Sequence, residues 1–434
     1  MRIVDLIQTK RDGGELSKEE IEFFLQGYLQ SQIPDYQAAG LLMAIYFSGL
    51  SDPELVDWTD TMLRQAKPLD LSDLPGPKID KESTGGVGDK TSLIVGPLAA
   101  AAGITVPMIA SRSVAHTGGT LDKIQSIPGF NAMLSAKEFK SVLRIAGLAV
   151  IGQTEELTPA DRKLSSLRDA TATVESIPLL TSSAISRKVA EGIDGVVFDV
   201  KTGSGALIKK MTDCRRLAQS LLNVAKRMQK KAICVISDMD QPLGNAVGNA
   251  LEVMEAVETM RGNGPADVVE LSTELAARMV CLAYPERTLD SAKEQIFQLL
   301  NDGSALKKFR QLIEVQGGNA QIIDSFELLP TASAEFVISS PRAGYVSRIS
   351  ADDIGQACML LGTIRDNKEP GIDFAVGIVL EHKVGDRVQS GERLCTIYYN
   401  EETNLEEASQ MVEDAFHISA TAPEARTLIY EVLQ

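Results

Sequence analysis

The segment Lys81–Leu93, KESTGGVGDKTSL, combines glycines, hydroxyl residues and two lysines, which are the residue types that bind phosphate. Glycine allows several backbone N–H groups to converge on one anion. Lys81, Ser83 and Ser92 add side-chain donors, and Thr91 or Ser92 can cap a following helix. The segment therefore predicts a phosphate-binding loop, although a tight glycine turn with solvated lysines explains the same letters.

A second segment, Ser111–Lys123 or SRSVAHTGGTLDK, again offers glycine amides and threonine hydroxyls directly after a predicted buried strand. Ligands of parallel sheets bind at the carboxyl ends of the strands. Two such loops after two strands favour one shared phosphate site over two unrelated turns.

A nucleoside-triphosphate site is a weaker explanation of the first loop. GDKT is close to a phosphate-loop motif, and VVFD, which ends at Asp199, has the pattern of an acidic strand end. That motif needs a glycine before its lysine, where this chain has Asp89, and an acid there would repel the phosphates.

Composition limits the classes of partner. A formal net charge of −16 disfavours nucleic acid and anionic membranes, which require basic surfaces. The five cysteines form no CxxC pair, which disfavours a disulfide framework or a zinc site and indicates a reducing compartment. The N-terminal residues show no export signal, so we expect a cytoplasmic protein. Prolines and glycines interrupt the apolar segment Leu93–Ala110, which predicts a buried helix, a turn and a buried strand rather than a membrane span.

The pattern along the chain predicts an α/β protein with three parts. Residues 1–67 and 160–192 are expected to form an all-helical domain, with a capping box at Ser17–Glu20 and another helix start at Ser51. Residues 75–159 and 193–330 alternate β-branched runs with helices, which predicts a mixed, mainly parallel sheet. Residues 331–434 are β-rich and resemble a barrel-sandwich domain of the lipoyl or biotinyl type without its attachment lysine.

Several long motifs resemble those of the thymidine and pyrimidine-nucleoside phosphorylases. They are STGGVGD, HTGGTLDK, VIGQT, LTPAD, RDATATVESIPLLTSS, DVKTGSGA and ISDMDQPLGNAVGNALEV. The resemblance covers essentially the whole chain. It implies a homodimer with a cleft between a helical and an α/β domain, and it implies reversible phosphorolysis of a nucleoside to free base and sugar 1-phosphate. Inorganic phosphate is then the co-substrate, and no cofactor is expected.

The resemblance also implies roles for individual residues. Phosphate ligands are expected at Lys81, Ser83, Ser92 and Thr120, and base contacts at Arg168 and Ser183. Lys81 and Arg168 are the expected catalytic residues, together with Glu82. An arginine suits a base oxygen on which negative charge accumulates, because it is always protonated.

Departures from the family pattern cluster around the base. Glu82 replaces a histidine, Arg187 a lysine and Ser165 a tyrosine, while Ala110 replaces the serine that opens the second loop, followed by Ser111 and Ser113 in place of glycines. Glu82 could act as a general acid only if burial raised its pKa above about 4.3. Otherwise it accepts hydrogen bonds from an amino group or ring N–H. An altered base preference and compensated drift in a uridine or thymidine enzyme both remain open.

Lys90 is another departure. Some family members hold K⁺ beside the glycine loop at positions that match Gly88, Leu243, Ala246, Glu255 and Lys90. We expect the Lys90 ammonium to fill this site, so that no metal is required. A Lys90 side chain that points into solvent is the alternative.

Other possibilities are phosphorolysis of a nucleoside 5′-phosphate, a phosphoribosyltransferase of the anthranilate type that needs Mg²⁺, and a paralogue that binds without turnover. His116 is expected to orient the second loop. Lys188 is expected to be a solvated helix residue, and Lys201 receives no role.

Overall fold

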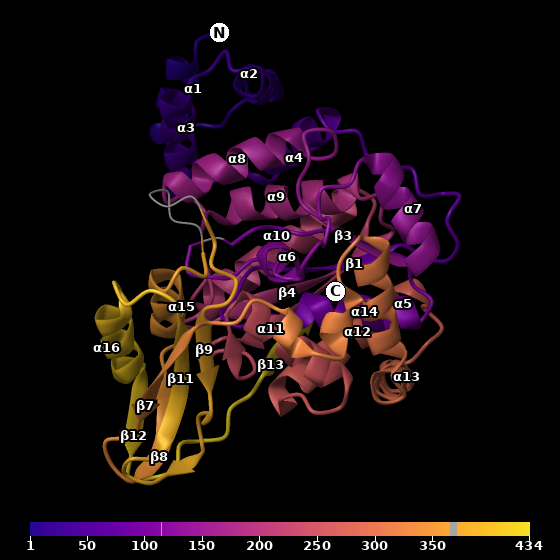
Figure 1. Ribbon diagram of the computed structural model, residues 1–434. Helices are drawn as coiled ribbons and strands as arrows, with labels where there is room; N and C mark the ends of the chain where they lie inside the picture. Colours follow the sequence, from indigo (N-terminus) through magenta and orange to yellow (C-terminus); the bar gives the residue numbers. More distant parts are fainter. Residues whose placement is uncertain (114, 365–370) are drawn as a thin grey trace.

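The computed structural model describes residues 1–113, 115–364 and 371–434 of the chain. The remaining residues, one of which (residue 114) belongs to the second loop, lie outside the described part. Helices at the N-terminus, a central α/β region and a β-rich C-terminal region follow one another in space, as Figure 1 shows. The mixed α/β fold class predicted from the sequence is confirmed.

Six helices form the first region: α1 (Ile3–Arg11), α2 (Lys18–Leu29), α3 (Asp35–Ser48), α4 (Asp52–Arg64), α8 (Pro159–Ala170) and α9 (Ile177–Ala190). The Ser17 hydroxyl accepts a hydrogen bond from the Glu20 amide and the Glu20 carboxylate accepts one from the Ser17 amide, so the predicted capping box is confirmed. The core that joins α8 and α9 to the N-terminal helices contains Trp58, Leu164 and Leu179. Segments far apart in the sequence therefore share one core.

A four-stranded sheet forms the centre of the α/β region, in the order β1 (Ile79–Ser83), β4 (Gly195–Thr202), β5 (Lys231–Asp238) and β13 (Ile429–Leu433). The first three strands are parallel, and β13 pairs antiparallel with β5. A second parallel pair consists of β2 (Val106–Ile109) and β3 (Leu148–Ile151). The last strand of the chain, β13, therefore belongs to the α/β sheet, whereas the sequence analysis placed it in the C-terminal region.

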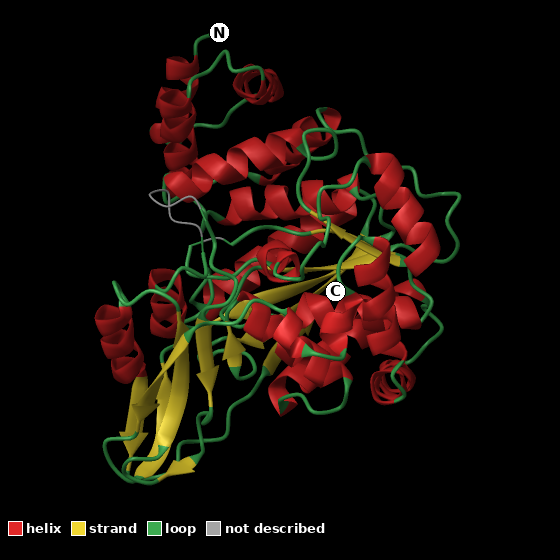
Figure 2. Cartoon of the chain, in the orientation of Figure 1, coloured by secondary structure: helices red, strands yellow, loops and turns green. Residues whose placement is uncertain are grey.

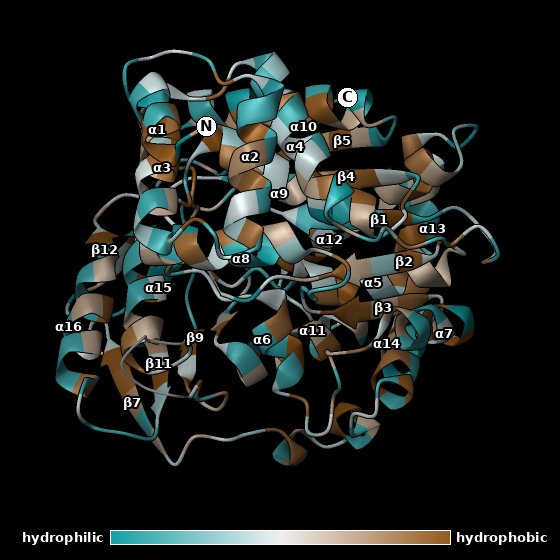
Figure 3. Cartoon of the chain, turned by 90° about the horizontal axis from the view of Figure 1, so that it is seen from above, coloured by the Kyte–Doolittle hydropathy of each residue, from teal (hydrophilic) through white to brown (hydrophobic). Residues whose placement is uncertain are grey.

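The helices of this region are α5 (Thr91–Ala101), α6 (Thr120–Gln125), α7 (Ala136–Ala146), α10 (Met211–Arg227), α11 (Asn249–Met260), α12 (Ala266–Ala283), α13 (Leu289–Asn301) and α14 (Ser304–Val315). Two short 3₁₀ turns, η1 (Ala320–Ile323) and η2 (Phe326–Leu328), follow them. Helix α5 is almost completely buried, and hydrophobic residues gather around it and around β2 and β3 (Figure 3). The buried helix and strand predicted for Leu93–Ala110 are therefore confirmed, and none of the helices that the structure describes is long and apolar enough to cross a bilayer.

The C-terminal region consists of two open sheets with two helices (Figure 2). One sheet has the order β10 (Arg387–Val388), β8 (Gly344–Ile349), β12 (Phe416–Ser419). The other has the order β6 (Ala246–Val247), β9 (Gly377–Leu380), β11 (Arg393–Tyr399), β7 (Ala334–Ser339). The helices are α15 (Ala351–Leu360) and α16 (Leu405–Ala415). Because β6 comes from the α/β region, backbone pairing attaches this β-rich region to the segment that follows β5.

A buried ion pair links α1 to α4 in the helical region. Lys10 Nζ lies 2.8 and 2.9 Å from the two carboxylate oxygens of Glu54, and both side chains are at most 3% exposed. The Leu16 and Ser51 amides also donate to this carboxylate. Burial opposes ionisation of Glu54, but these hydrogen bonds and Lys10 outweigh it and lower the pKa of the carboxyl.

We expect Lys10→Met to lower the free energy of unfolding of the helical region by about 3–5 kcal/mol, because it leaves a buried carboxylate without its cation. Trp58, the chain's single tryptophan, is fully buried in this region, so its fluorescence during urea denaturation reports the loss. Lys18→Met removes an exposed lysine from α2 and is the control. Equal midpoints for the two variants would contradict the prediction.

Candidate active site

A cavity of ≈650 Å³ lies where the two glycine loops meet helices α8 and α9. Its walls contain every side chain predicted to contact phosphate or base: Lys81, Glu82, Ser83, Ser92, Thr120, Ser165, Arg168, Ser183 and Arg187. These residues come from β1, α5, α6, α8 and α9, so only the tertiary fold brings them together.

Lys81 and Ser83 lie at the carboxyl end of β1 and point to the face covered by α5. Lys81 Nζ donates to Thr91 Oγ1 at 2.6 Å and to Ser92 Oγ at 3.3 Å. The turn between Lys81 and Thr91 needs glycine at position 88. Gly88 has φ +73°, and a Cβ there would lie 2.6 Å from the Leu243 carbonyl oxygen. The loop therefore fixes the lysine and the serine hydroxyl at the start of α5.

Asp89 is buried inside this loop and accepts a hydrogen bond from Ser83 Oγ at 2.5 Å and one from Thr91 Oγ1 at 2.5 Å. It also accepts from the Thr91 amide, whereas no Thr91 or Ser92 side chain caps α5, so the predicted side-chain cap is wrong. Burial opposes ionisation of Asp89, but the charges of Lys201, Lys81 and Lys123 outweigh it and hold its pKa well below the usual range. Because cations surround Asp89, it repels a phosphate in the loop less strongly than the sequence analysis assumed.

Lys201 is the main participant that sequence analysis missed. Its side chain is fully buried, with Nζ 2.7 Å from Asp199 Oδ2 and 3.8 Å from Asp89 Oδ2. Asp199 also accepts a hydrogen bond from Ser237 Oγ at 2.5 Å and lies 3.8 Å from Lys81 Nζ. The DVKTGSGA motif contains both Asp199 and Lys201, and their alternation on a buried strand was the available signal.

Arg168 is buried at the end of α8 and donates to three backbone carbonyls, those of Thr173 at 3.4 Å, Val174 at 2.6 Å and Leu179 at 3.1 Å. These bonds fix the segment between α8 and α9. Burial lowers the pKa of Arg168 to about 10, so the guanidinium still carries its charge at neutral pH.

Arg187 on α9 joins three polar groups of the base side. Its Nη1 donates to Asp161 Oδ2 at 2.8 Å and to Ser183 Oγ at 2.7 Å, and its Nη2 donates to Glu82 Oε1 at 2.6 Å. Asp161, which lies in the LTPAD motif, also accepts from the hydroxyls of Ser183 and Ser165. Sequence analysis named the donors but missed this shared acceptor.

Glu82 is held by two cations, since Lys188 Nζ lies 3.0 Å from its Oε2 while Arg187 binds the other oxygen. Burial opposes ionisation of Glu82, but Lys188 and Arg187 outweigh it and lower its pKa. A general acid would need a raised pKa, so the lowered pKa favours the hydrogen-bond acceptor over the general acid.

The predicted solvation of Lys188 is wrong. Its side chain is 1% exposed and it also binds Asp80 at 2.5 Å and Glu191 at 2.7 Å.

Lys90 points inward, so the solvent-exposed alternative is wrong. Its fully buried Nζ donates to the Leu243 carbonyl at 2.8 Å, the Ala246 carbonyl at 2.9 Å and the Glu255 carboxylate. Two carbonyls and a carboxylate around one ammonium make the same oxygen-rich environment that a monovalent cation requires. Across the described residues, no group of His, Cys, Asp and Glu is arranged to hold a metal ion.

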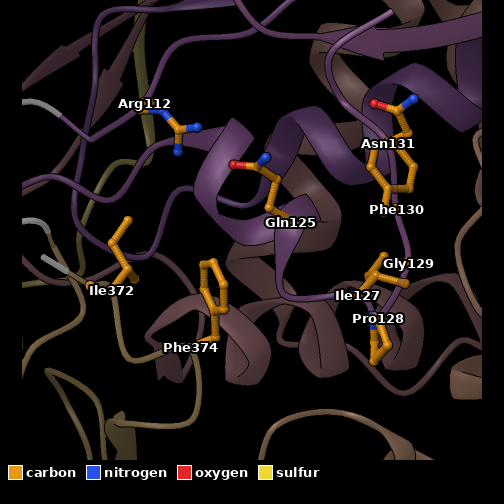
Figure 4. A pocket seen from close by; sticks show the side chains of 10 residues that line it. Arg112, Gln125, Ile127, Pro128, Gly129, Phe130, Asn131, Ile372 and Phe374 are labelled. Atoms are coloured by element: carbon orange, nitrogen blue, oxygen red, sulfur yellow. The ribbon is translucent and has the colours of Figure 1, made fainter.

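The second loop is held against the C-terminal region. His116 Nε2 lies 3.4 Å from the Gly205 carbonyl and 3.3 Å from Asp352 on α15. A further cavity of ≈610 Å³, shown in Figure 4, lies between Arg112 of this loop, Gln125 of α6 and Phe374. Arg112 borders both cavities, but none of the predicted phosphate or base residues lines the second one.

Comparison with known proteins agrees with this architecture. Residues 75–306 match the glycosyl transferase family a/b domain, residues 4–66 its helical bundle domain and residues 345–419 the pyrimidine nucleoside phosphorylase C-terminal domain. Anthranilate phosphoribosyltransferase from Thermus thermophilus shares the fold, with a TM-score of 0.59 at 16% identity over 72% of this chain and 99% of that chain.

Curated relatives match along the whole chain. The pyrimidine-nucleoside phosphorylase of Geobacillus stearothermophilus is 47% identical over 99% of both chains. Those of Bacillus subtilis and Staphylococcus haemolyticus are 47% and 46% identical over 100% of both chains. The chain therefore belongs to the pyrimidine-nucleoside phosphorylase family of pentosyltransferases.

Proposed function

We propose that this enzyme catalyses the reversible phosphorolysis of a pyrimidine nucleoside to free base and ribose or deoxyribose 1-phosphate. The observation that carries the proposal is that the predicted phosphate ligands and base ligands line one cavity. Membership of a family whose curated members are named for this activity supports it.

Lys81, Ser83, Ser92 and Thr120 hold inorganic phosphate on the α/β side of the cavity. Lys81 already lies within hydrogen-bonding distance of Ser92, so one anion can contact both. The buried carboxylates Asp89 and Asp199 keep the hydroxyls and lysines oriented. A phosphate oxygen then attacks the anomeric carbon while the carbon–nitrogen bond to the base breaks, and its electron pair remains on the base.

Arg168, Ser183, Arg187, Ser165 and Glu82 surround the base on the helical side. Positive charge near the departing base stabilises the transition state more than the ground state, because the base gains electron density only as the bond breaks. Phosphate and these side chains supply the required charges, so the proposed reaction needs no cofactor.

We expect Ser92→Ala to lower kcat/KM for phosphate about 10-fold to 100-fold, because it removes a hydrogen bond to a charged group worth about 1.5–3 kcal/mol. Base release from a panel of pyrimidine nucleosides, with and without phosphate, measures this loss. Ser409→Ala on α16, outside this cavity, is the control. Base release that does not depend on phosphate would refute the proposed reaction.

We also propose that the Lys90 ammonium substitutes for a bound K⁺ beside the glycine loop. Replacing KCl with NaCl at constant ionic strength should then leave wild-type activity unchanged. Lys90→Thr removes the ammonium but keeps the acceptors of Leu243, Ala246 and Glu255, so this variant should require K⁺ for full activity. A strong K⁺ stimulation of the wild type would contradict the substitution.

The assembly that we propose is a homodimer formed through α1 and α3. Helices α1 and α3, together with Met1, expose large apolar side chains that a monomer would leave in water: Met1, Val4, Tyr36, Tyr46 and Phe47. All five cysteines are free, which agrees with the cytoplasmic location that we assign.

Sedimentation should give the mass of a dimer for the wild type. The double variant Tyr36→Asp, Phe47→Asp should sediment as a monomer, because it places two charges in the apolar surface, where these side chains are 77% and 80% exposed in the single chain. Glu335→Gln, on the exposed strand β7, should remain a dimer. A wild-type monomer at micromolar concentration would refute this assembly.

A further inference from the structure

Glu82 presents a fixed negative charge to the base side of the cavity. Alternation along β1 places Asp80 and Glu82 on the face that meets α9, opposite to Lys81. One Glu82 oxygen binds Arg187 and the other binds Lys188. Lys188 donates to three carboxylates, those of Asp80, Glu82 and Glu191, and so has no donor left for a ligand. Glu82 is therefore fixed in position.

The carboxylate nevertheless retains capacity for a ligand. An ionised carboxylate has about four acceptor positions, and Arg187 and Lys188 occupy two of them. Glu82 lines the cavity and keeps 13% of its side chain exposed. Beside it, Arg187 Nε is buried and has no hydrogen-bond partner among the described residues. Glu82 thus offers free acceptor positions to the cavity, and the guanidinium that binds it keeps one unused donor.

Free acceptor positions fit a base edge that presents N–H donors, and this requirement separates two kinds of base. A dioxo base such as uracil has carbonyl oxygens on both sides of its ring N–H, and a carbonyl oxygen placed against a carboxylate oxygen is repelled. An amino base can be protonated on the ring nitrogen beside its amino group before it leaves. The carboxylate stabilises that cation by hydrogen bonds to the amino group and the protonated nitrogen.

We propose that Glu82, held in place by Lys188 and Arg187, makes the enzyme selective for pyrimidine nucleosides whose base carries an amino group next to a ring nitrogen, such as cytosine or isocytosine. This inference rests on the phosphorolysis proposed above and specifies its substrate class. Glu82 is the specificity-determining residue, and Lys188, which lines no part of the cavity, acts through it as a positioning residue.

The reaction balances without a further reactant. Dihydrogen phosphate transfers one proton to the ring nitrogen of the base, which leaves hydrogen phosphate as the nucleophile. Its oxygen bonds to the anomeric carbon, and the electron pair of the broken carbon–nitrogen bond neutralises the positive charge of the ring. The products are the neutral amino base and the sugar 1-phosphate.

The test compares phosphate-dependent base release from cytidine, isocytidine and uridine. For the wild type we expect kcat/KM for at least one amino nucleoside to exceed that for uridine by about tenfold or more. Glu82→Gln has the same shape without the charge and should reduce this ratio by about tenfold or more. Lys188→Met should reduce the ratio in the same direction, whereas Glu335→Gln should leave it unchanged.

Binding of the free bases to the wild type, measured by calorimetry, provides a second readout that does not depend on whether the variants fold. Tighter binding of cytosine or isocytosine than of uracil supports the inference. A wild-type preference for uridine and uracil overturns the inference but leaves phosphorolysis intact. If no nucleoside releases base with phosphate, the proposed function fails instead.

Discussion

The site depends on the balance of charges buried where β1 and β4 meet α5, α6 and α11. Lys81, Lys123 and Lys201 lie among three carboxylates, those of Asp89, Asp199 and Glu252, and all six side chains are at least nine-tenths buried. An unpaired charge in such a place would destabilise the fold by several kcal/mol. Together the six charges cancel, and they hold Lys81 and the Ser83 hydroxyl in the cavity at the end of a rigid strand.

On the base side of the cavity, buried acids likewise balance and position the cations, but they come from different elements. Arg187 and Lys188 are neighbours on α9, yet they bind acids from two other elements, Asp161 on α8 and Asp80 and Glu82 on β1. The ion pairs with Asp80 and Glu82 connect the helical region to the central sheet. Any relative movement of the two regions must break or rearrange them.

The formal net charge of −16 is compatible with the phosphate site that we propose. Attraction does not come from the overall surface but from a few lysines whose positions are fixed by buried acids. The Lys90 ammonium extends this arrangement, because it joins the glycine loop to the Leu243–Ala246 turn next to β6, the strand that pairs with β9 of the C-terminal region.

The sequence by itself determined the types of element and the chemical character of the loops. Capping residues, β-branched runs and glycine positions act over a few residues, so Ser17–Glu20 and the buried segment Leu93–Ala110 could be predicted from local patterns. The resemblance to a known family supplied the candidate site residues, and the fold places all of them around one cavity.

Only the tertiary structure decided how the charged groups are paired. Asp161, Lys188 and Lys201 have the same appearance in a sequence as solvated residues, and no local pattern indicates which partner each will find. The β13 pairing with β5 is likewise a contact between residues almost two hundred positions apart. Ionisation follows from these contacts, since the pKa of Glu82 is lowered by cations on another element. Burial and partners are properties of the folded chain, and they set the direction in which the pKa of Glu82 is shifted.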